Sequence, residues 1–348
     1  MSSITVVVPV YNVEGYLDWC LESLERQTLA DIEIICVNDG STDGSRAKLS
    51  DWLRRDSRIR VIDKPNGGLS SARNAGIEAA SSSYVCFLDS DDRFHSDACE
   101  QMVRLLDQTG ADVLTFGATC YPKEAGYPWL VDVLSPRDVV YEGFSPDILF
   151  REKSRPFAWR TACRTSFLRE RGVRFEEGLR FGEDQVFDFA VYPRASKIAL
   201  SSKKLYEYRV VREGSLMDRL RGDFGTKMLE HVKILGCILR DWSDLGILHR
   251  YAPEMVSFSL DFALYDAIKL DDAAYHAVAE SLRGLLMQYW DADEVAKMDL
   301  PPATRKMALE ACYHTEMSAL ARKRLVLSYY AQQHGKKAVL RRILTGRE

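Results

Sequence analysis

Short apolar runs alternate with amphipathic stretches through the first third of the chain. Residues 4–10 are apolar and largely β-branched, which is typical of a strand buried on both faces. Residues 16–27, which follow, carry leucines at helical spacing. The alternation predicts a parallel sheet with helical crossovers. Further strands are expected at 32–37, 59–62, 84–88 and 112–116, and further helices at 45–55, 71–80 and 97–109.

The regular alternation ends after residue 116. Residues 121–141 contain three prolines and scattered aromatic side chains, which favours a long surface loop. From about residue 223, long helical periodicity dominates. We therefore expect an α/β domain over residues 1–215 and a helical C-terminal region over residues 216–348. Additional strands are expected at 157–163, 198–200 and 205–208, and additional helices at 166–171, 182–192, 224–245, 251–270 and 273–290.

Composition narrows the class of protein. The 348 residues are 46% hydrophobic and 28% charged with a net charge of -4, which describes a soluble globular protein and argues against nucleic-acid binding. The N-terminus lacks a basic region, Pro9 interrupts the first apolar run, and no stretch approaches the about 18 apolar residues of a membrane span. Eight scattered cysteines without a CxxC pair favour reduced core thiols. A cytoplasmic location is therefore expected.

The last stretch of the chain is basic. Residues 322–347 contain eight lysines and arginines and no acid. This segment is either a solvated helical face or a foothold on anionic lipid at the inner face of the membrane, where each basic residue contributes about 1 kcal/mol. The helical region could also support a homodimer or cover an acceptor site.

The apolar run at residues 84–88 ends abruptly in acids. Asp89, Asp91 and Asp92 follow it. Ligands of open α/β sheets bind at the carboxyl ends of the strands, and carboxylate oxygens there suit a hard divalent cation that can in turn hold a diphosphate. The alternative is an acidic turn before a helix capped by Ser96.

Two earlier strands end in similarly polar turns. Residues 9–12 read Pro-Val-Tyr-Asn, and residues 37–45 read Val-Asn-Asp-Gly-Ser-Thr-Asp-Gly-Ser. Taken alone, the second motif favours an Asx turn and a helix cap. Because all three turns are expected on the same edge of one sheet, together they favour a shared ligand.

Three further motifs carry candidate chemistry. Glycines before the helix expected at 71–80 let the backbone approach a ligand, and Arg73 lies where Asp89 or a phosphate would suit it. Glu183 and Asp184 open another helix, where they either match the helix dipole or include a general base. Arg209 ends a strand and either clamps a phosphate or makes a surface ion pair.

Together, in this order and spacing, the motifs resemble the inverting glycosyltransferases of family 2, which have the GT-A fold. The resemblance covers about the first 215 residues and points to the bacterial capsule and exopolysaccharide type. It implies a hexosyl- or N-acetylhexosaminyltransferase that uses a nucleotide sugar, most commonly a UDP sugar, and a glycan or lipid-linked acceptor. The QxxRW signature of processive synthases is absent, so one or a few sugars would be added. The motifs that carry the resemblance lie at 8–12, 37–43, 67–76, 87–92 and 182–184.

The resemblance also implies roles for individual residues. Asp91, with Asp89, would hold Mn²⁺ or Mg²⁺, and Asp184 would be the catalytic base with Glu183 beside it. The residues implied to bind the nucleotide are Pro9, Tyr11, Asp39, Asn66, Arg73, Asp89, Arg209 and Ser215.

The acceptor side is less defined. Trp159 would stack on an acceptor sugar, and Trp129 would do so from the loop; plain packing is the alternative for both. A non-catalytic nucleotide- or glycan-binding protein on the same fold is the alternative function. A nucleotidyltransferase is disfavoured because residues 11–15, after the first strand, lack a glycine-rich basic loop.

Overall fold

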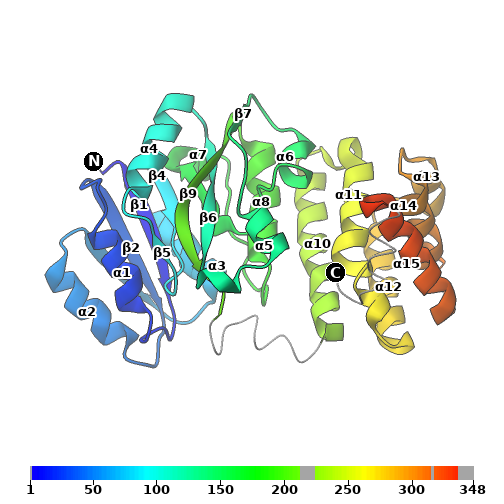
Figure 1. The fold of residues 1–348 in the computed structure, drawn as a ribbon, viewed down its shortest axis with the longest axis horizontal. Coiled ribbons are helices and arrows are strands. Elements are labelled where there is room, and N and C mark those ends of the chain that lie inside the picture. The colour runs from blue at the N-terminus through cyan, green and yellow to red at the C-terminus, as the bar shows by residue number, and fades with distance from the viewer. Residues whose placement is uncertain (1, 212–223, 315–316, 336–348) are drawn as a thin grey trace. The chain divides into compact units, whose positions relative to one another are not determined.

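The structure is a computed structural model that describes residues 2–211, 224–314 and 317–335. The chain divides into two compact units, Met1–Glu213 and Gly214–Glu348. The first unit is built around a mixed sheet and the second is helical (Figure 1).

The sheet of the first unit has the strand order β3-β2-β1-β4-β8-β6-β9-β5, and β7 pairs with β9 off this path. β1 to β4 run parallel, as predicted, and β6 runs parallel to β9. β8 is antiparallel to both β4 and β6, so β4 and β6 point the same way and their carboxyl ends meet at one edge. The strands are β1 (Ile4–Val10), β2 (Ile32–Asp39), β3 (Ile59–Lys64), β4 (Tyr84–Phe87), β5 (Arg93–Phe94), β6 (Val113–Tyr121), β7 (Val139–Tyr141), β8 (Thr161–Arg164) and β9 (Ile198–Arg209).

Helices connect and cover these strands. The predicted helix at 45–55 is confirmed with the same bounds, and the predicted strand at 4–10 likewise matches β1, whose seven residues are all buried. α3 lies close against β1. Gly76 permits this approach, since a Cβ at this position would be only 2.2 Å from Cγ1 of Val7. This approach positions the side chains of α3 near the edge of the sheet. The helices are α1 (Leu17–Glu25), α2 (Ser45–Arg55), α3 (Leu69–Ala79), α4 (Ala98–Thr109), α5 (Pro128–Val133), α6 (Pro146–Phe150), α7 (Thr165–Glu170) and α8 (Glu183–Arg194).

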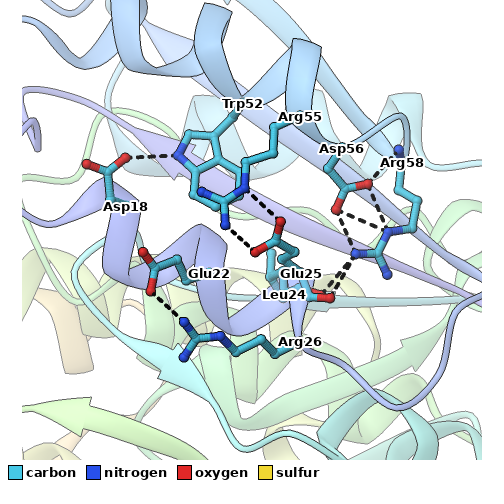
Figure 2. A network of polar contacts seen from close by, with 9 residues as sticks. All are labelled: Asp18, Glu22, Leu24, Glu25, Arg26, Trp52, Arg55, Asp56 and Arg58. Carbon is cyan, nitrogen blue, oxygen red and sulfur yellow. Dashed lines mark hydrogen bonds and ion pairs between the residues drawn. The ribbon is translucent and has the colours of Figure 1, made fainter.

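A polar network joins α1 and α2, the helices that follow β1 and β2 (Figure 2). Trp52 Nε1 donates to Asp18 at 2.9 Å, and Arg55 makes a two-pronged ion pair with Glu25 at 2.7 and 2.5 Å. Arg58 donates to backbone carbonyls at the end of α1. Each exposed pair contributes little by itself, but the bidentate geometry fixes how the two helices lie together.

Three segments differ from the sequence-based expectation. Residues 121–141, expected as a loop, include the 3₁₀ turn Lys123–Ala125, α5 and β7, because β7 pairs with the edge of β9. The two short strands expected at 198–208 form one continuous strand, β9. The strand expected at 157–163 begins only at Thr161, since a 3₁₀ turn precedes it.

The second unit confirms the predicted helical C-terminal region. The expected helix at 251–270 is broken by the π turn Leu260–Leu264 and the 3₁₀ turn Ala267–Lys269. Among the described residues, no helix is long and apolar enough to cross a membrane. The helices are α10 (Phe224–Asp244), α11 (Ala252–Ser259), α12 (Asp272–Leu286), α13 (Ala292–Lys297), α14 (Pro302–Lys306) and α15 (Ala319–His334).

Much of the basic tail lies outside the described residues. Arg322, which is described, is buried, pairs with Asp272 and lies 4.2 Å from the ring centroid of Tyr275. It therefore belongs to the helical core rather than to a solvated face, whereas Lys323 and Arg324 are exposed.

Candidate active site

One buried arginine joins two acidic motifs that are far apart in the sequence. Arg73 Nη1, on α3, donates to Glu183 Oε1 at 2.9 Å and to Asp184 Oδ1 at 2.8 Å. Its Nη2 donates to Asp89 Oδ1 at 2.8 Å, just beyond β4. Gly182, with φ of 78°, lets the chain turn into α8 so that both acids sit at its start. The structure thus brings the candidate base and the first acid of the candidate metal motif to one guanidinium.

This geometry bears on the predicted role of Arg73. The sequence assigned the residue to the nucleotide, but its side chain is only 1% exposed and both terminal nitrogens already donate to carboxylates. In this geometry Arg73 holds three carboxylates in place, and its contact with a nucleotide stays a prediction. The expectation that Asp89 would be its partner is confirmed.

Burial dominates the electrostatics of Asp184. Loss of solvation raises the pKa of this carboxyl to about 8, against the opposing pull of the Arg73 cation. The neighbouring Glu183 and Asp89 carboxyls raise the pKa of Asp184 further. An acid in this environment holds its proton more tightly than an exposed aspartate does, so it is a stronger proton acceptor once ionised.

The three acids after β4 have different surroundings. Asp92 is 1% exposed and accepts hydrogen bonds of 2.6 Å from Tyr206 Oη and from the backbone N–H of Arg209. Burial, with the nearby Asp91 and Asp89 charges, raises the pKa of Asp92 well above its usual range. Asp92 therefore ties the acidic turn to β9, whereas Asp89 and Asp91 are partly exposed.

Asp89 and Asp91 fit a hard cation by ligand chemistry. Both offer carboxylate oxygens, the donors that Mg²⁺ and Mn²⁺ prefer. Within the described ranges, no group of three or more His, Cys, Asp or Glu side chains is arranged to hold a metal ion by itself. A cation at this turn would therefore take further oxygens from a bound diphosphate and from water, as Mg²⁺ commonly does.

Arg209 lies beside the acidic turn. Its Nε donates to the backbone carbonyl of Asp91 at 2.9 Å. Its guanidinium carbon lies 4.3 Å from the ring centroid of Trp19, 5.0 Å from that of Tyr121 and 5.2 Å from that of Tyr16. The aromatic rings hold the Arg209 guanidinium at the sheet edge. Its contact with a diphosphate stays a prediction. Ser215, its predicted companion, lies outside the described residues.

The turns after β1 and β2 are tied together. Asn12, with φ of 51°, accepts from the backbone N–H of Thr42 at 2.8 Å through its side-chain oxygen. The Val13 N–H donates to Ser45 Oγ at 2.9 Å. These bonds leave Tyr11 46% exposed on the edge, while Pro9 is buried within β1. Tyr11 is thus accessible to a ligand, whereas the predicted contact of Pro9 with the nucleotide stays a prediction.

Asp39 anchors the glycine turn before α3. It is 3% exposed and accepts from Gly67 N–H at 2.9 Å, from Gly68 N–H at 2.8 Å and from Lys64 Nζ at 2.6 Å. A carboxylate offers about four acceptor sites, so one remains for a nucleoside. Asn66, in the same turn, is exposed. Nucleoside binding by Asp39 and Asn66 stays a prediction.

The prediction that Trp159 stacks on an acceptor sugar is wrong, because the packing buries this ring. The side chain is 2% exposed, and its ring stacks on Tyr206 with centroids 4.1 Å apart and on Phe157 with centroids 5.0 Å apart. Trp159 instead supports Tyr206, whose hydroxyl bonds to Asp92. Trp129, by contrast, is 53% exposed.

Two residues at the site escaped the sequence analysis. Tyr206 bridges the acidic turn, donating to Asp92 and accepting from the backbone N–H of Asp89. Asp188 lies one helical turn after Asp184, is fully buried, and neither of its carboxyl oxygens has a hydrogen-bond partner. Burial raises the pKa of Asp188 well above its usual range. Two signals in the sequence could have identified these residues. For Tyr206 the signal is the two-residue period of side chains along β9, and for Asp188 it is the four-residue spacing from Asp184 along α8.

Comparison with known proteins places the chain in a family. The profile of the family described as Glycosyl transferase family 2 matches residues 5–171. The "Uncharacterized glycosyltransferase EpsJ" of Bacillus subtilis (strain 168) is 35% identical over 210 residues, covering 59% of this chain and 60% of EpsJ. The "Putative glycosyltransferase EpsH" of the same organism is 30% identical over 274 residues, covering 70% of this chain and 78% of EpsH.

A solved structure shares the fold. S. aureus TarS 1-349, crystallised in complex with UDP, matches with a TM-score of 0.71 at 18% identity, covering 96% of this chain and 92% of TarS 1-349. A second crystal structure of the same TarS fragment holds UDP-GlcNAc and matches with a TM-score of 0.70. The predicted GT-A fold with C-terminal helices is confirmed, and by its matching profile and its identity to EpsH the chain belongs to glycosyl transferase family 2.

Proposed function

We propose that this protein transfers a sugar from a UDP sugar to a glycan or lipid-linked glycan acceptor during cell-surface polysaccharide synthesis. The transfer inverts the anomeric centre and is non-processive, and we assign it to residues 1–215. The observation that carries the proposal is the Arg73 bridge, which holds Asp184 and Asp89 on one edge of the sheet. The binding of UDP and UDP-GlcNAc by TarS, which has the same fold, supports the choice of nucleotide.

The charge balance of the edge supports a metal requirement. Even with Asp92 and Asp184 protonated, as their raised pKa values favour, the carboxylates of Asp89, Asp91 and Glu183 outnumber the cations of Arg73 and Arg209. A diphosphate entering such a field is repelled unless a cation accompanies it. Asp91 and Asp89 would hold that cation, Mn²⁺ or Mg²⁺, which when bound stabilises the negative charge on the departing UDP. Arg209, at the end of β9, would contact the diphosphate, and we assign a second contact to Ser215.

Asp184 performs the proton transfer in this proposal. Its carboxylate accepts the proton of the acceptor hydroxyl while that oxygen attacks the anomeric carbon from the face opposite UDP. One displacement gives inversion. Arg73 keeps the carboxylate in place, and the buried setting makes Asp184 a stronger base than a surface aspartate. Glu183 shares the Arg73 contact and helps to position the guanidinium.

The test of this function is a donor screen. Purified protein with Mn²⁺ is given a panel of UDP, GDP and dTDP sugars, and nucleotide release is measured with and without oligosaccharide acceptors. We expect slow release from one class of UDP sugar without acceptor, and faster release with one. Binding of UDP without release from any donor would instead favour the non-catalytic alternative. The predicted membrane contact through the basic C-terminal segment and the predicted homodimer stay predictions.

A further inference from the structure

Two large aromatic side chains of α5 are open to solvent. Tyr127, which immediately precedes the helix, is 50% exposed and Trp129 is 53% exposed. Their rings lie nearly parallel, with an interplanar angle of 12° and centroids 6.1 Å apart. Exposed apolar side chains that lie side by side in a fixed shape are characteristic of binding sites. Apolar side chains that are exposed singly are common and need no such explanation.

α5 is held in a fixed shape by residues from distant parts of the chain. Leu130 is 2% exposed and anchors the inner face of the helix. Buried Arg160 donates from Nη1 to the carbonyl of Val133 at 2.6 Å, and Lys204 donates from Nζ to the carbonyl of Leu134 at 2.6 Å. Cations at the carboxyl end of a helix also match its dipole. A helix of six residues is not stable alone, so these contacts preset the exposed rings.

The segment that carries the rings starts at the sheet edge where the acids lie. β6 ends at Tyr121, next to Arg209 of β9, and the segment that carries Tyr127 starts there. The end of α5 is joined back to β6, where the Ala118 N–H donates to the carbonyl of Leu134 at 3.1 Å. The platform is therefore carried by a segment that leaves the sheet beside Arg209, whose backbone N–H bonds to Asp92 of the acidic turn.

We propose that Tyr127 and Trp129 form a stacking platform for a pyranose ring of the acceptor glycan. This inference rests on the proposed glycosyl transfer. The apolar C–H face of a pyranose packs on a flat aromatic surface, and a rigid aromatic pair loses little conformational entropy on binding. The platform would hold a sugar of the acceptor while its terminal hydroxyl reaches Asp184.

A second copy of this chain is a weaker candidate for the platform. A fully buried aromatic side chain covers about 150–250 Å². Two rings therefore supply about 300–500 Å², below the about 800 Å² per partner of a stable protein interface. One sugar ring needs only such a small surface. The size of the platform thus favours a glycan.

The kinetic test compares three variants on the same helix. We expect Trp129→Ala to raise the acceptor KM at least tenfold, with the effect confined to the acceptor, and Trp129→Phe to recover part of the loss. Val131→Ala is the matched control, since Val131 is 51% exposed on the same helix but carries no ring. An unchanged acceptor KM in Trp129→Ala would overturn the platform. So would a change in oligomeric state, measured by light scattering, without a change in KM.

A binding test separates the platform from the proposed function. Tetrasaccharides of glucose, galactose and N-acetylglucosamine are titrated into the full chain, followed by tryptophan fluorescence. We expect at least one to bind, with at least tenfold loss of affinity in Trp129→Ala and none in Val131→Ala. If this pattern holds while the donor screen finds no turnover, the platform stands and the transfer proposal fails. If turnover is found but no tetrasaccharide discriminates between the two variants and the acceptor KM is unchanged, the platform fails alone.

Discussion

Asp184→Asn is expected to lower the rate of sugar transfer by about 10²–10⁴-fold, the usual contribution of a positioned general base. Asparagine has nearly the same shape as aspartate but cannot accept the proton of the acceptor hydroxyl. Affinity for UDP should stay within a few-fold, because Asp89 of the proposed metal site bonds to Nη2 of Arg73 whereas Asp184 bonds to Nη1. The measurements are kcat with saturating donor and acceptor, and UDP affinity by calorimetry.

Glu183→Gln is the matched control for this prediction. It removes a carboxylate that contacts the same Arg73 nitrogen, 2.9 Å from Glu183 Oε1, but it leaves the proposed base intact. We expect a much smaller loss of kcat than in Asp184→Asn. Turnover in Asp184→Asn comparable to the wild type would remove Asp184 from the base role.

The pH profile gives the same assignment an independent readout. Burial raises the pKa of Asp184 to about 8, so the ionised, active form is lost as the pH falls through that value in the unliganded site. A bound cation would lower this pKa, because it favours the carboxylate. We therefore expect kcat to rise with pH through an apparent pKa above the ordinary aspartate value of about 3.9. The residual activity of Asp184→Asn should lack this limb.

Arg73→Gln is expected to lower both stability and activity. The substitution leaves Asp89, Glu183 and Asp184 without their shared counter-charge in a site where Arg73 is 1% exposed. Removing one partner of a buried ion pair costs about 3–5 kcal/mol, part of which the carboxyls can relieve by taking up protons. Transfer should fall as well, because Asp184 loses the contact that orients it. The measurements are urea unfolding and kcat.

Two variants sharpen this second prediction. Arg46→Gln breaks the ion pair with Asp63, whose side chains are 40% and 49% exposed, and should change the free energy of unfolding by less than about 1 kcal/mol. Arg73→Lys keeps the charge but not the planar fork, so it should restore only part of the stability. If Arg73→Gln unfolds at the same urea concentration as the wild type, the ion pairs of Arg73 do not contribute to the stability of the protein.

Much of the fold was predictable because its signals are local. β1 is apolar except for Thr5 and lies between β2 and β4, so its burial was predictable from the sequence. α5 was missed because a six-residue helix depends on Arg160 and Lys204, which come from distant segments. The antiparallel position of β8 depends in the same way on long-range pairing, which periodicity does not encode.

The site was predictable in its residue types but less so in their partners. The sequence places Asp89 after a strand and Asp184 at a helix start, yet the bridge through Arg73 spans 111 positions to Asp184. Whether a tryptophan ring is exposed depends on its neighbours. Tyr206 and Phe157 cover Trp159, whereas Trp129 is exposed on α5. Residue type alone carries no information about which ring is covered.

The central claim is that a cation at Asp91 and Asp89 lets this acidic edge bind a nucleoside diphosphate, and calorimetric titration of UDP tests it most directly. Wild-type protein is titrated in Mn²⁺ and again in chelator, and Asp91→Asn is titrated in the same two conditions. We expect UDP to bind the wild type at least tenfold more tightly with Mn²⁺, and the variant to lose most of this difference. Equal affinity of the wild type with Mn²⁺ and with chelator would contradict the account.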